Sequence, residues 1–187
     1  MIAKYMNKYV ILLRGINVGG KNKISMAELK SCLKKQCFEH VNTYIQSGNI
    51  LLQSALDART IGPEIEKLLS QKFKLDSPLI KVLVLSDSKL KAVIDEKPEG
   101  FGEYPKKYHS DVIFLMGIDS SQAIALFNPR EGVDRVWPSN GVIYSQRLSA
   151  LRTKSRLSKV TGTPEYKSMT IRNWNTALKL LVLLQTD

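Results

Sequence analysis

Hydrophobic and polar positions along the first half of the chain predict alternating strands and helices. An uninterrupted apolar run from Tyr9 to Leu13 is typical of a strand that is covered on both faces. Apolar positions at helical spacing predict helices from Met26 to about Gln36 and from Ile61 to Phe73. Between them, Gly48-Asn49 separates two β-prone runs and favours a two-residue hairpin turn, and a further strand is expected from Leu79 to Leu85. This β-α-β-β-α-β order is that of a ferredoxin-like fold.

A related order is expected in the second half. Ser86-Asp87-Ser88 can cap a helix that ends near Pro98, and the glycines and proline between Glu99 and His109 indicate a linker. The next predicted elements are a strand at Asp111–Met116, a helix at Ser120–Phe127, a hairpin around Pro138-Ser139-Asn140-Gly141, a helix at Ser149–Val160 and a last helix capped by Thr170. We therefore expect an α+β protein with two subdomains. The first, ferredoxin-like, covers residues 1–97, and a related but irregular one covers residues 98–187 and ends in a C-terminal helix.

Charge is unevenly distributed along the sequence. The formal net charge is +11, and lysine and arginine concentrate in residues 1–40 and 147–187, whereas the middle of the chain is nearly neutral. If the two basic ends meet in space, they form one positive face that favours nucleic acid or another polyanion. A generally basic surface that keeps the protein dissolved is the alternative, because net charge alone indicates only non-specific attraction.

The glycine-rich stretch between the first strand and the first helix is the principal candidate site. Its glycines leave backbone amides accessible, and basic side chains add positive charge beside them. The candidate ligand-binding residues are Arg14, Gly15, Asn17, Gly19, Gly20 and Lys21. The spacing G-x-x-x-x-G-K is that of a P-loop, but Asn22 stands where a P-loop needs the Ser or Thr that holds magnesium. Two interpretations stay open: a different anion-binding loop, and a tight strand-to-helix connection without a ligand.

Two stretches of the second half add candidate residues for an anion, Lys154 and Arg156 in one and Arg172 and Asn173 in the other. Basic side chains recur at helical spacing in the first stretch and could follow phosphates, although a solvated helix face has the same pattern. In the second stretch, polar side chains crowd the helix N-terminus expected at Thr170, where amides and the helix dipole favour an anion. A helix cap followed by a packed Trp174 explains that pattern equally well.

Other chemistries are not supported by the sequence. The expected first and third strands lack the aromatic side chains that stack bases in an RNA-recognition sheet. Cys32, Cys37 and His40 lack the ligand spacing of a zinc site, so we expect two free thiols, no metal and no cofactor. With two histidines, His40 and His109, and no G-x-S-x-G elbow, hydrolase chemistry is not indicated. The apolar runs are too short for a membrane span or a signal peptide, and a cytoplasmic protein is expected.

Three blocks of the sequence carry a resemblance to a known family. They are Leu13-Arg14-Gly15-Ile16-Asn17-Val18-Gly19-Gly20-Lys21-Asn22, Thr43-Tyr44-Ile45-Gln46-Ser47-Gly48-Asn49 and the stretch from Thr170 to Thr176. Together they resemble the bacterial family catalogued as domain of unknown function 1697. The resemblance implies a two-part α+β protein with a ferredoxin-like first half, but no activity, cofactor or catalytic residue. This sequence departs from the family pattern near Thr153-Lys154-Ser155-Arg156-Leu157. Relatives tend to carry a glycine before the serine, which a lysine or arginine and then a leucine follow. If that glycine lets the backbone approach a ligand, the site is altered in this chain.

The leading interpretation is a non-catalytic protein that binds an anionic ligand, such as nucleic acid or a nucleotide. Two alternatives stay open: an enzyme that acts on a phosphorylated small molecule in a cleft between the subdomains, and a protein-interaction module whose charge is incidental. An extended basic surface would favour the first interpretation, and a closed pocket with a perturbed carboxylate or histidine would favour the enzyme. No residue set defines a reaction, and the sequence does not indicate an oligomeric state.

Overall fold

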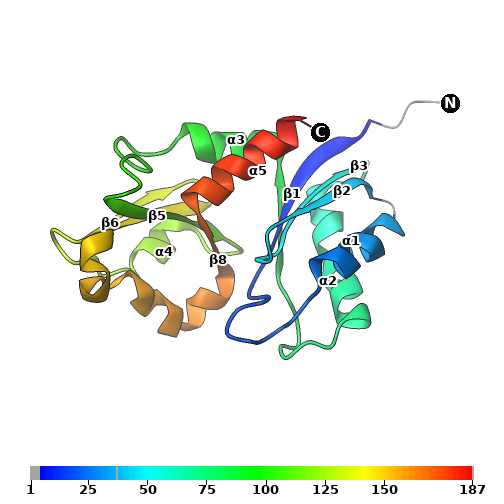
Figure 1. Ribbon diagram of the computed structural model, residues 1–187, viewed down its shortest axis with the longest axis horizontal. Coiled ribbons are helices and arrows are strands. Elements are labelled where there is room, and N and C mark those ends of the chain that lie inside the picture. Colours follow the sequence, from blue (N-terminus) through cyan, green and yellow to red (C-terminus); the bar gives the residue numbers. More distant parts are fainter. Residues whose placement is uncertain (1–4, 37, 187) are drawn as a thin grey trace. The chain divides into compact units, whose positions relative to one another are not determined.

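The computed structural model describes residues 5–36 and 38–186 and has a mixed α+β fold with two four-stranded antiparallel sheets (Figure 1). The predicted α+β class is therefore confirmed. The chain divides into two compact units: unit 1 holds the described residues up to Lys91 and from Lys179 onward, and unit 2 is Ala92–Leu178. Both divisions fall inside helices, α3 (Asp87–Asp95) and α5 (Trp174–Thr186). Cys32 is a free thiol, and the expectation for Cys37 lies outside the described residues.

In unit 1 the elements follow the order β-α-β-β-α-β. They are β1 (Asn7–Leu13), α1 (Met26–Lys34), β2 (Glu39–Tyr44), β3 (Asn49–Ser54), α2 (Ala58–Lys72) and β4 (Val82–Ser86). The strand order β2-β3-β1-β4 is compatible with the expected ferredoxin-like arrangement. The central strand β1 pairs with β3 and β4, and Val10 to Leu13 are fully buried. Burial on both faces explains why this run is apolar without alternation.

The two helices of unit 1 pack their apolar stripes into one core with alternate residues of the strands. That core includes Ile11, Leu13, Ile50 and Leu52 from the strands, Met26, Leu29 and Leu33 from α1, and Ile61, Ile65, Leu68 and Leu69 from α2. A side chain caps the start of each helix: Ser25 Oγ accepts the Glu28 amide at 3.3 Å, and Asp57 Oδ1 accepts the Thr60 amide at 3.0 Å. The helical periodicity of the sequence therefore identified the buried stripe of both helices.

Unit 2 repeats the strand order of unit 1 with a different set of helices. Its elements are β5 (Tyr108–Leu115), α4 (Ser120–Ile124), β6 (Asp134–Ser139), β7 (Val142–Leu148), the 3-10 helices η1 (Ser149–Lys154), η2 (Leu157–Gly162) and η3 (Pro164–Ser168), and β8 (Met169–Asn173). The antiparallel order β6-β7-β5-β8 corresponds strand for strand to β2-β3-β1-β4. Three 3-10 helices stand where unit 1 has α2, in agreement with the expectation of a related but irregular second half.

Two helix predictions in unit 2 are wrong. The helix expected at Ser149–Val160 is broken at Ser155, which is extended (φ −63°, ψ 143°), because the Arg156 amide donates to Asp134 Oδ2 at 2.8 Å instead of continuing a helix. The helix expected to start at Thr170 starts at Trp174, since Met169–Asn173 form β8 and pair with β5.

The hairpin turn predicted at Gly48-Asn49 is also placed wrongly. Asn49 already belongs to β3, and the four residues Ile45 to Gly48 connect the strands. The hairpin expected around Pro138-Ser139-Asn140-Gly141 is confirmed, and Asn140-Gly141 are its two connecting residues, because Ser139 and Val142 are paired. The helix start predicted near Ser86 is confirmed, because Ser86 Oγ accepts the Lys89 amide at 3.3 Å.

The segment expected to be a linker supplies part of the core of unit 2. Phe101 is fully buried, and its ring makes edge contacts with Trp137, Tyr144 and Trp174 at centroid distances of 5.9, 5.0 and 5.1 Å. The Tyr144 hydroxyl donates to the Val93 carbonyl at 2.6 Å. In the part of the chain that the structure describes, no helix has both the length and the apolar character needed to cross a bilayer.

Candidate functional site

The residues between β1 and α1, here called the glycine loop (14–23), end in a tight exposed turn. Lys21 N donates to Val18 O at 3.1 Å, and the two residues form an isolated bridge. The intervening Gly19 and Gly20 have φ values of +59° and +77°, and no atom lies within 4 Å of a Cβ built on either. Glycine is therefore needed here for its backbone conformation and not for close packing.

Two asparagine side chains fix the base of the glycine loop. Asn17 Oδ1 accepts the Ile24 amide at 2.8 Å, and its Nδ2 donates to the carbonyls of Ile24 and Gln46 at 3.0 and 2.8 Å. The buried Asn22 accepts the amides of Asp76 and Ser77 at 2.9 and 3.0 Å. Its Nδ2 donates to the carbonyl of Gly15 at 3.0 Å. Asn17 and Asn22 thus hold the loop in shape, since their side-chain oxygens and amide nitrogens already have partners.

The tip of the loop differs from its base because it carries hydrogen-bond donors that have no acceptor among the described residues. Among residues 5–36 and 38–186, the amides of Gly19 and Gly20 donate to no protein acceptor. Lys21 is exposed beside them. The first helical residue after the loop is Met26, so Lys21 does not lie on the first turn of α1 as a P-loop lysine would. The geometry is that of an exposed turn that carries donors and a positive charge.

In unit 2 the buried Asp134 of β6 holds two basic segments together. Its Oδ2 accepts the amides of Arg130 and Arg156 at 3.0 and 2.8 Å. The Arg130 guanidinium in turn donates to the carbonyl of Lys154 at 3.3 Å. We call Arg130, Lys154 and Arg156 the basic triad. The triad replaces the helix stripe expected from the sequence, and Arg130 was not among the predicted residues.

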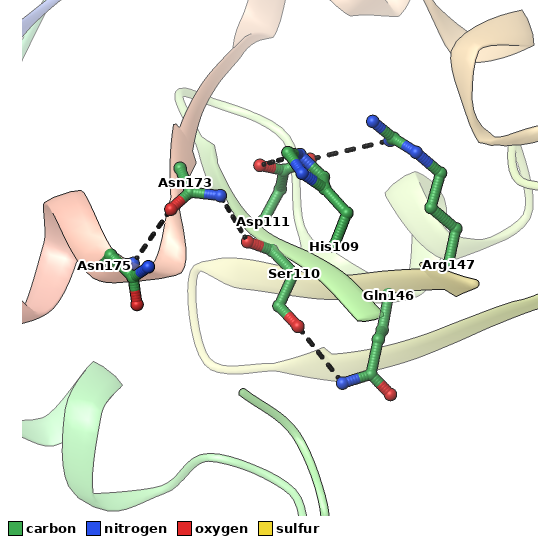
Figure 2. Close-up of polar contacts among 7 residues, drawn as sticks. All are labelled: His109, Ser110, Asp111, Gln146, Arg147, Asn173 and Asn175. Atoms are coloured by element: carbon green, nitrogen blue, oxygen red, sulfur yellow. Dashed lines mark hydrogen bonds and ion pairs between the residues drawn. The ribbon is translucent and has the colours of Figure 1, made fainter. Parts of the chain in front are cut away.

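Arg172 and Asn173 lie at the end of β8. Arg172 is 6% exposed, and its guanidinium donates to Thr170 Oγ1 at 2.9 Å and to the Ile171 carbonyl at 2.8 Å. Burial lowers the pKa of Arg172 to about 10, so it stays charged at neutral pH. Asn173 donates to the Ser110 carbonyl at 3.1 Å and accepts the Asn175 amide at 3.1 Å (Figure 2). Asn173 therefore connects the end of β8 to β5 and to the first turn of α5.

A polar cluster on the strands of unit 2 was not predicted from the sequence. Figure 2 shows His109, Asp111 and Arg147 on one side of the strands, and Ser110 and Gln146 on the other. His109 Nε2 lies 3.0 Å from Asp111 Oδ2, and Arg147 Nη1 lies 3.8 Å from the same oxygen. The Asp111 side chain is 16% exposed and that of His109 is 40% exposed.

The surroundings of Asp111 have opposing effects on the pKa of its carboxyl group. Burial raises the pKa of the Asp111 carboxyl above its ordinary value, while the charges of His109 and Arg147 and a hydrogen bond from Asn173 oppose the rise. The carboxylate orients the imidazole, whose Nδ1 is left as the proton acceptor when Nε2 carries the hydrogen. The pair can chemically accept a proton from a group that reaches the imidazole, because the His109 side chain is 40% exposed.

Comparison with known proteins identifies the family. A family model described as Protein of unknown function (DUF1697) matches residues 6–144. The chain belongs to this family. It is also similar to a solved structure, described as that of a conserved bacterial protein from Streptococcus pneumoniae. The similarity covers 96% of this chain and 99% of that one, with 28% sequence identity and a TM-score of 0.77. A search of curated proteins found no match.

The predicted site residues of this DUF1697 protein fall into separate groups. The six from Arg14 to Lys21 belong to the glycine loop of unit 1, and the other four belong to the basic triad and to the end of β8 in unit 2. Two signals in the sequence could have revealed the residues that were missed. His109 and Asp111 are two positions apart and so share one face of a strand, and the alternation Met169, Thr170, Ile171 is typical of a strand.

Proposed function

We propose that this DUF1697 protein binds an anionic ligand at the tip of the glycine loop, and that the ligand is a nucleotide or nucleic acid bound without catalysis. The observation that supports the proposal is the pair of glycine amides, Gly19 and Gly20, without acceptors among the described residues. Adjacent N–H groups at positive-φ glycines can donate together to phosphate oxygens. Lys21 would add a charge-assisted hydrogen bond to the same group.

The rigidity of the loop supports binding at its tip. A flexible loop loses conformational entropy when it closes on a ligand, and this loss weakens affinity. The asparagine contacts at the base, from Asn17 to Ile24 and from Asn22 to the segment Asp76-Ser77, order the loop before any ligand arrives. In this proposal Gly15 and Asn17 maintain the loop conformation, and the residues at the tip bind the anion. Arg14 is a further candidate for contact with the anion.

The basic triad gives unit 2 its own surface for phosphate contacts. The buried Asp134 fixes the two segments that carry the triad by accepting the amides of Arg130 and Arg156, and the side chains of Arg130 and Lys154 are exposed. Such a surface suits the backbone of a polymer, which presents one charge after another. Arg172 and Asn173 would act indirectly, by holding the end of β8. A cytoplasmic location stays a prediction from the sequence.

A thermal-shift comparison of three proteins tests the proposal. Wild type, Lys21→Ala and Lys34→Ala are screened against inorganic phosphate, nucleotides, sugar phosphates and short oligonucleotides. Lys34 is exposed on α1 and serves as a control with the same loss of charge in unit 1. We expect a stabilising ligand for wild type and Lys34→Ala, and none for Lys21→Ala. A polyanion held by surface charge alone should lose its effect by 0.5 M salt, where the Debye length is about 4 Å.

The polar cluster of unit 2 favours a second candidate function, an enzyme that acts on a phosphorylated small molecule. His109 with Asp111 can accept a proton from water, and the adjacent Arg147 can attract an anionic substrate. The enzyme hypothesis requires a closed pocket with a perturbed carboxylate or histidine, and Asp111 is a carboxylate of this kind. A protein-interaction module stays a prediction from the sequence.

The enzyme candidate predicts hydrolysis of p-nitrophenyl phosphate that depends on His109. Removing a general base typically costs about a hundredfold or more in rate, so His109→Asn should reduce hydrolysis by that factor. His40→Asn is the matched control, because His40 is exposed, lies in β2 and has φ +47°, a conformation that asparagine tolerates. Absence of hydrolysis by the wild type, or equal rates in both variants, would remove the enzyme candidate.

A further inference from the structure

Unit 1 contains a hollow that the glycine loop does not share. It has a volume of about 330 Å³, and its lining residues come from the segment between α1 and β2, from the segment before α2 and from α2 itself. Its lining residues include Gln36, Phe38, Leu56, Glu64, Lys67 and Leu68. The glycine loop precedes α1 whereas the hollow follows it, and nine helical residues span about 13 Å. The two features are therefore separate sites on the same unit.

The floor of the hollow is apolar and continuous with the core. Phe38 and Leu68 are buried members of the core of unit 1, and the partly buried Leu56 packs against the same cluster. A second hollow of about 250 Å³ shares Gln36, Phe38 and Leu56 with the first. The two hollows therefore adjoin at these three residues. An apolar body that covers this floor would remove both surfaces from water.

The rim of the hollow is polar and carries more positive than negative charge. Lys67 and Lys72 of α2 are exposed, and Glu64 is the acidic residue of the lining. These side chains project from successive turns of one helix, above the apolar floor. A ligand with an anionic group at one end would place that group beside the two ammonium groups while its apolar part lies on the floor.

We propose that this hollow is a binding site for a small amphipathic organic anion, with an apolar body on Phe38, Leu56 and Leu68 and its charge beside Lys67 and Lys72. The volume lies within the range of small-molecule sites, about 300 to 1,000 Å³, and is too small for a folded partner. The site goes beyond the proposed function, because it uses neither the glycine loop nor the basic triad.

The fluorescent probe 8-anilinonaphthalene-1-sulfonate, which joins fused apolar rings to one sulfonate, tests the inference on the full chain. Wild type should bind the probe saturably under conditions where the protein is folded. Gln71→Trp places a large side chain at the rim and should weaken binding by about tenfold or more. Ser70→Trp is the matched control, because Ser70 is the adjacent exposed residue of α2 outside the lining, and its affinity should stay within about twofold of wild type.

A charge reversal supplies a second measurement that does not fill the hollow. Lys67→Glu should weaken probe binding about three- to tenfold, and Lys89→Glu, at an exposed position of α3, should leave it unchanged. Equal binding by Gln71→Trp and Ser70→Trp, or by the two charge variants, would overturn the inference, as would absence of saturable binding by the wild type. Lys21 does not line the hollow, so Lys21→Ala should bind the probe with the affinity of wild type. A failure of this inference is therefore distinguishable from a failure of the phosphate proposal.

Discussion

Replacing Gly102 by alanine is expected to destabilise the protein by about 3 to 5 kcal/mol, from overpacking and from backbone strain together. The new Cβ would overlap Trp174 Nε1 and lie 2.5 Å from its Cδ1, where no carbon can be accommodated. Gly102 also has φ +76°, a conformation that alanine adopts poorly. The indole cannot move aside freely, because Trp174 is 5% exposed and makes an edge contact with the buried Phe101.

Intrinsic fluorescence is well placed to measure this effect. The chain has two tryptophans, Trp137 and Trp174, and both belong to unit 2. Gly100→Ala is the matched control, since Gly100 has φ +73° but no atom within 4 Å of a built Cβ, and it should cost only about 1 kcal/mol of strain. Equal urea midpoints for Gly100→Ala and Gly102→Ala would show that the close packing of Gly102 on the indole is absent in solution.

Replacing Gly48 by valine should destabilise the protein by a comparable amount, about 3 to 5 kcal/mol. Gly48 has φ +78°, and its Cβ would lie 2.8 Å from Leu13 Cβ and 2.9 Å from Ile16 Cδ1. Leu13 Cβ is fixed by the backbone of the central strand, so it cannot yield as the end of a flexible side chain would. The Gly48 carbonyl also accepts the Leu13 amide at 2.8 Å, which ties the two segments together.

A control variant in the same unit separates the destabilisation caused by the steric clash from that caused by the backbone conformation. Gly20 has φ +77°, almost the same value, and open space around its built Cβ. Gly20→Val should therefore carry the conformational cost of about 1 to 3 kcal/mol without the clash. Unfolding by urea followed by far-ultraviolet circular dichroism compares the two variants. If Gly48→Val unfolds at the midpoint of Gly20→Val, the approach of Gly48 to β1 is refuted.

The fold of unit 1 could be predicted from the sequence because most of its local signals agreed with the tertiary structure. The apolar run at Tyr9–Leu13 became the buried central strand, and helical periodicity located α1 and α2. The hairpin was found, but its turn was misplaced, because Gly48-Asn49 has the composition of a two-residue turn whereas the chain uses four residues. Glycine is still required at position 48, because of its positive φ and the close approach of Leu13 and Ile16.

The end of unit 2 could not be predicted in the same way, because contacts distant in sequence determine it. Ser149–Val160 has a helical pattern, yet the buried carboxylate of Asp134 takes the Arg156 amide and interrupts the helix. Met169–Asn173 became a strand because β5 offered it a pairing edge. Hydrogen-bond competition of this kind overrides local propensity and leaves little trace in a short window of sequence.

The candidate site was predicted in outline only. Composition located the glycine loop, but it did not distinguish the fixed base at Asn17 and Asn22 from the exposed tip at Gly19 and Gly20. That distinction depends on which side chains find partners in the folded chain. Charge counting likewise found Lys154 and Arg156, while Arg130 joins them only through Asp134, which a linear pattern does not reveal.

If the tip of the glycine loop binds a phosphate-bearing ligand, the ligand should raise the melting temperature by an amount that can be calculated. A cognate ligand at 100 times its dissociation constant should stabilise the wild type by about 2.7 kcal/mol. In a chain of this length that corresponds to about 5 to 10 °C. We expect this shift for wild type and Lys34→Ala and its loss in Lys21→Ala, whose melting temperature without ligand should be nearly unchanged. Equal shifts in wild type and Lys21→Ala would contradict this expectation and leave the loop a structural connection.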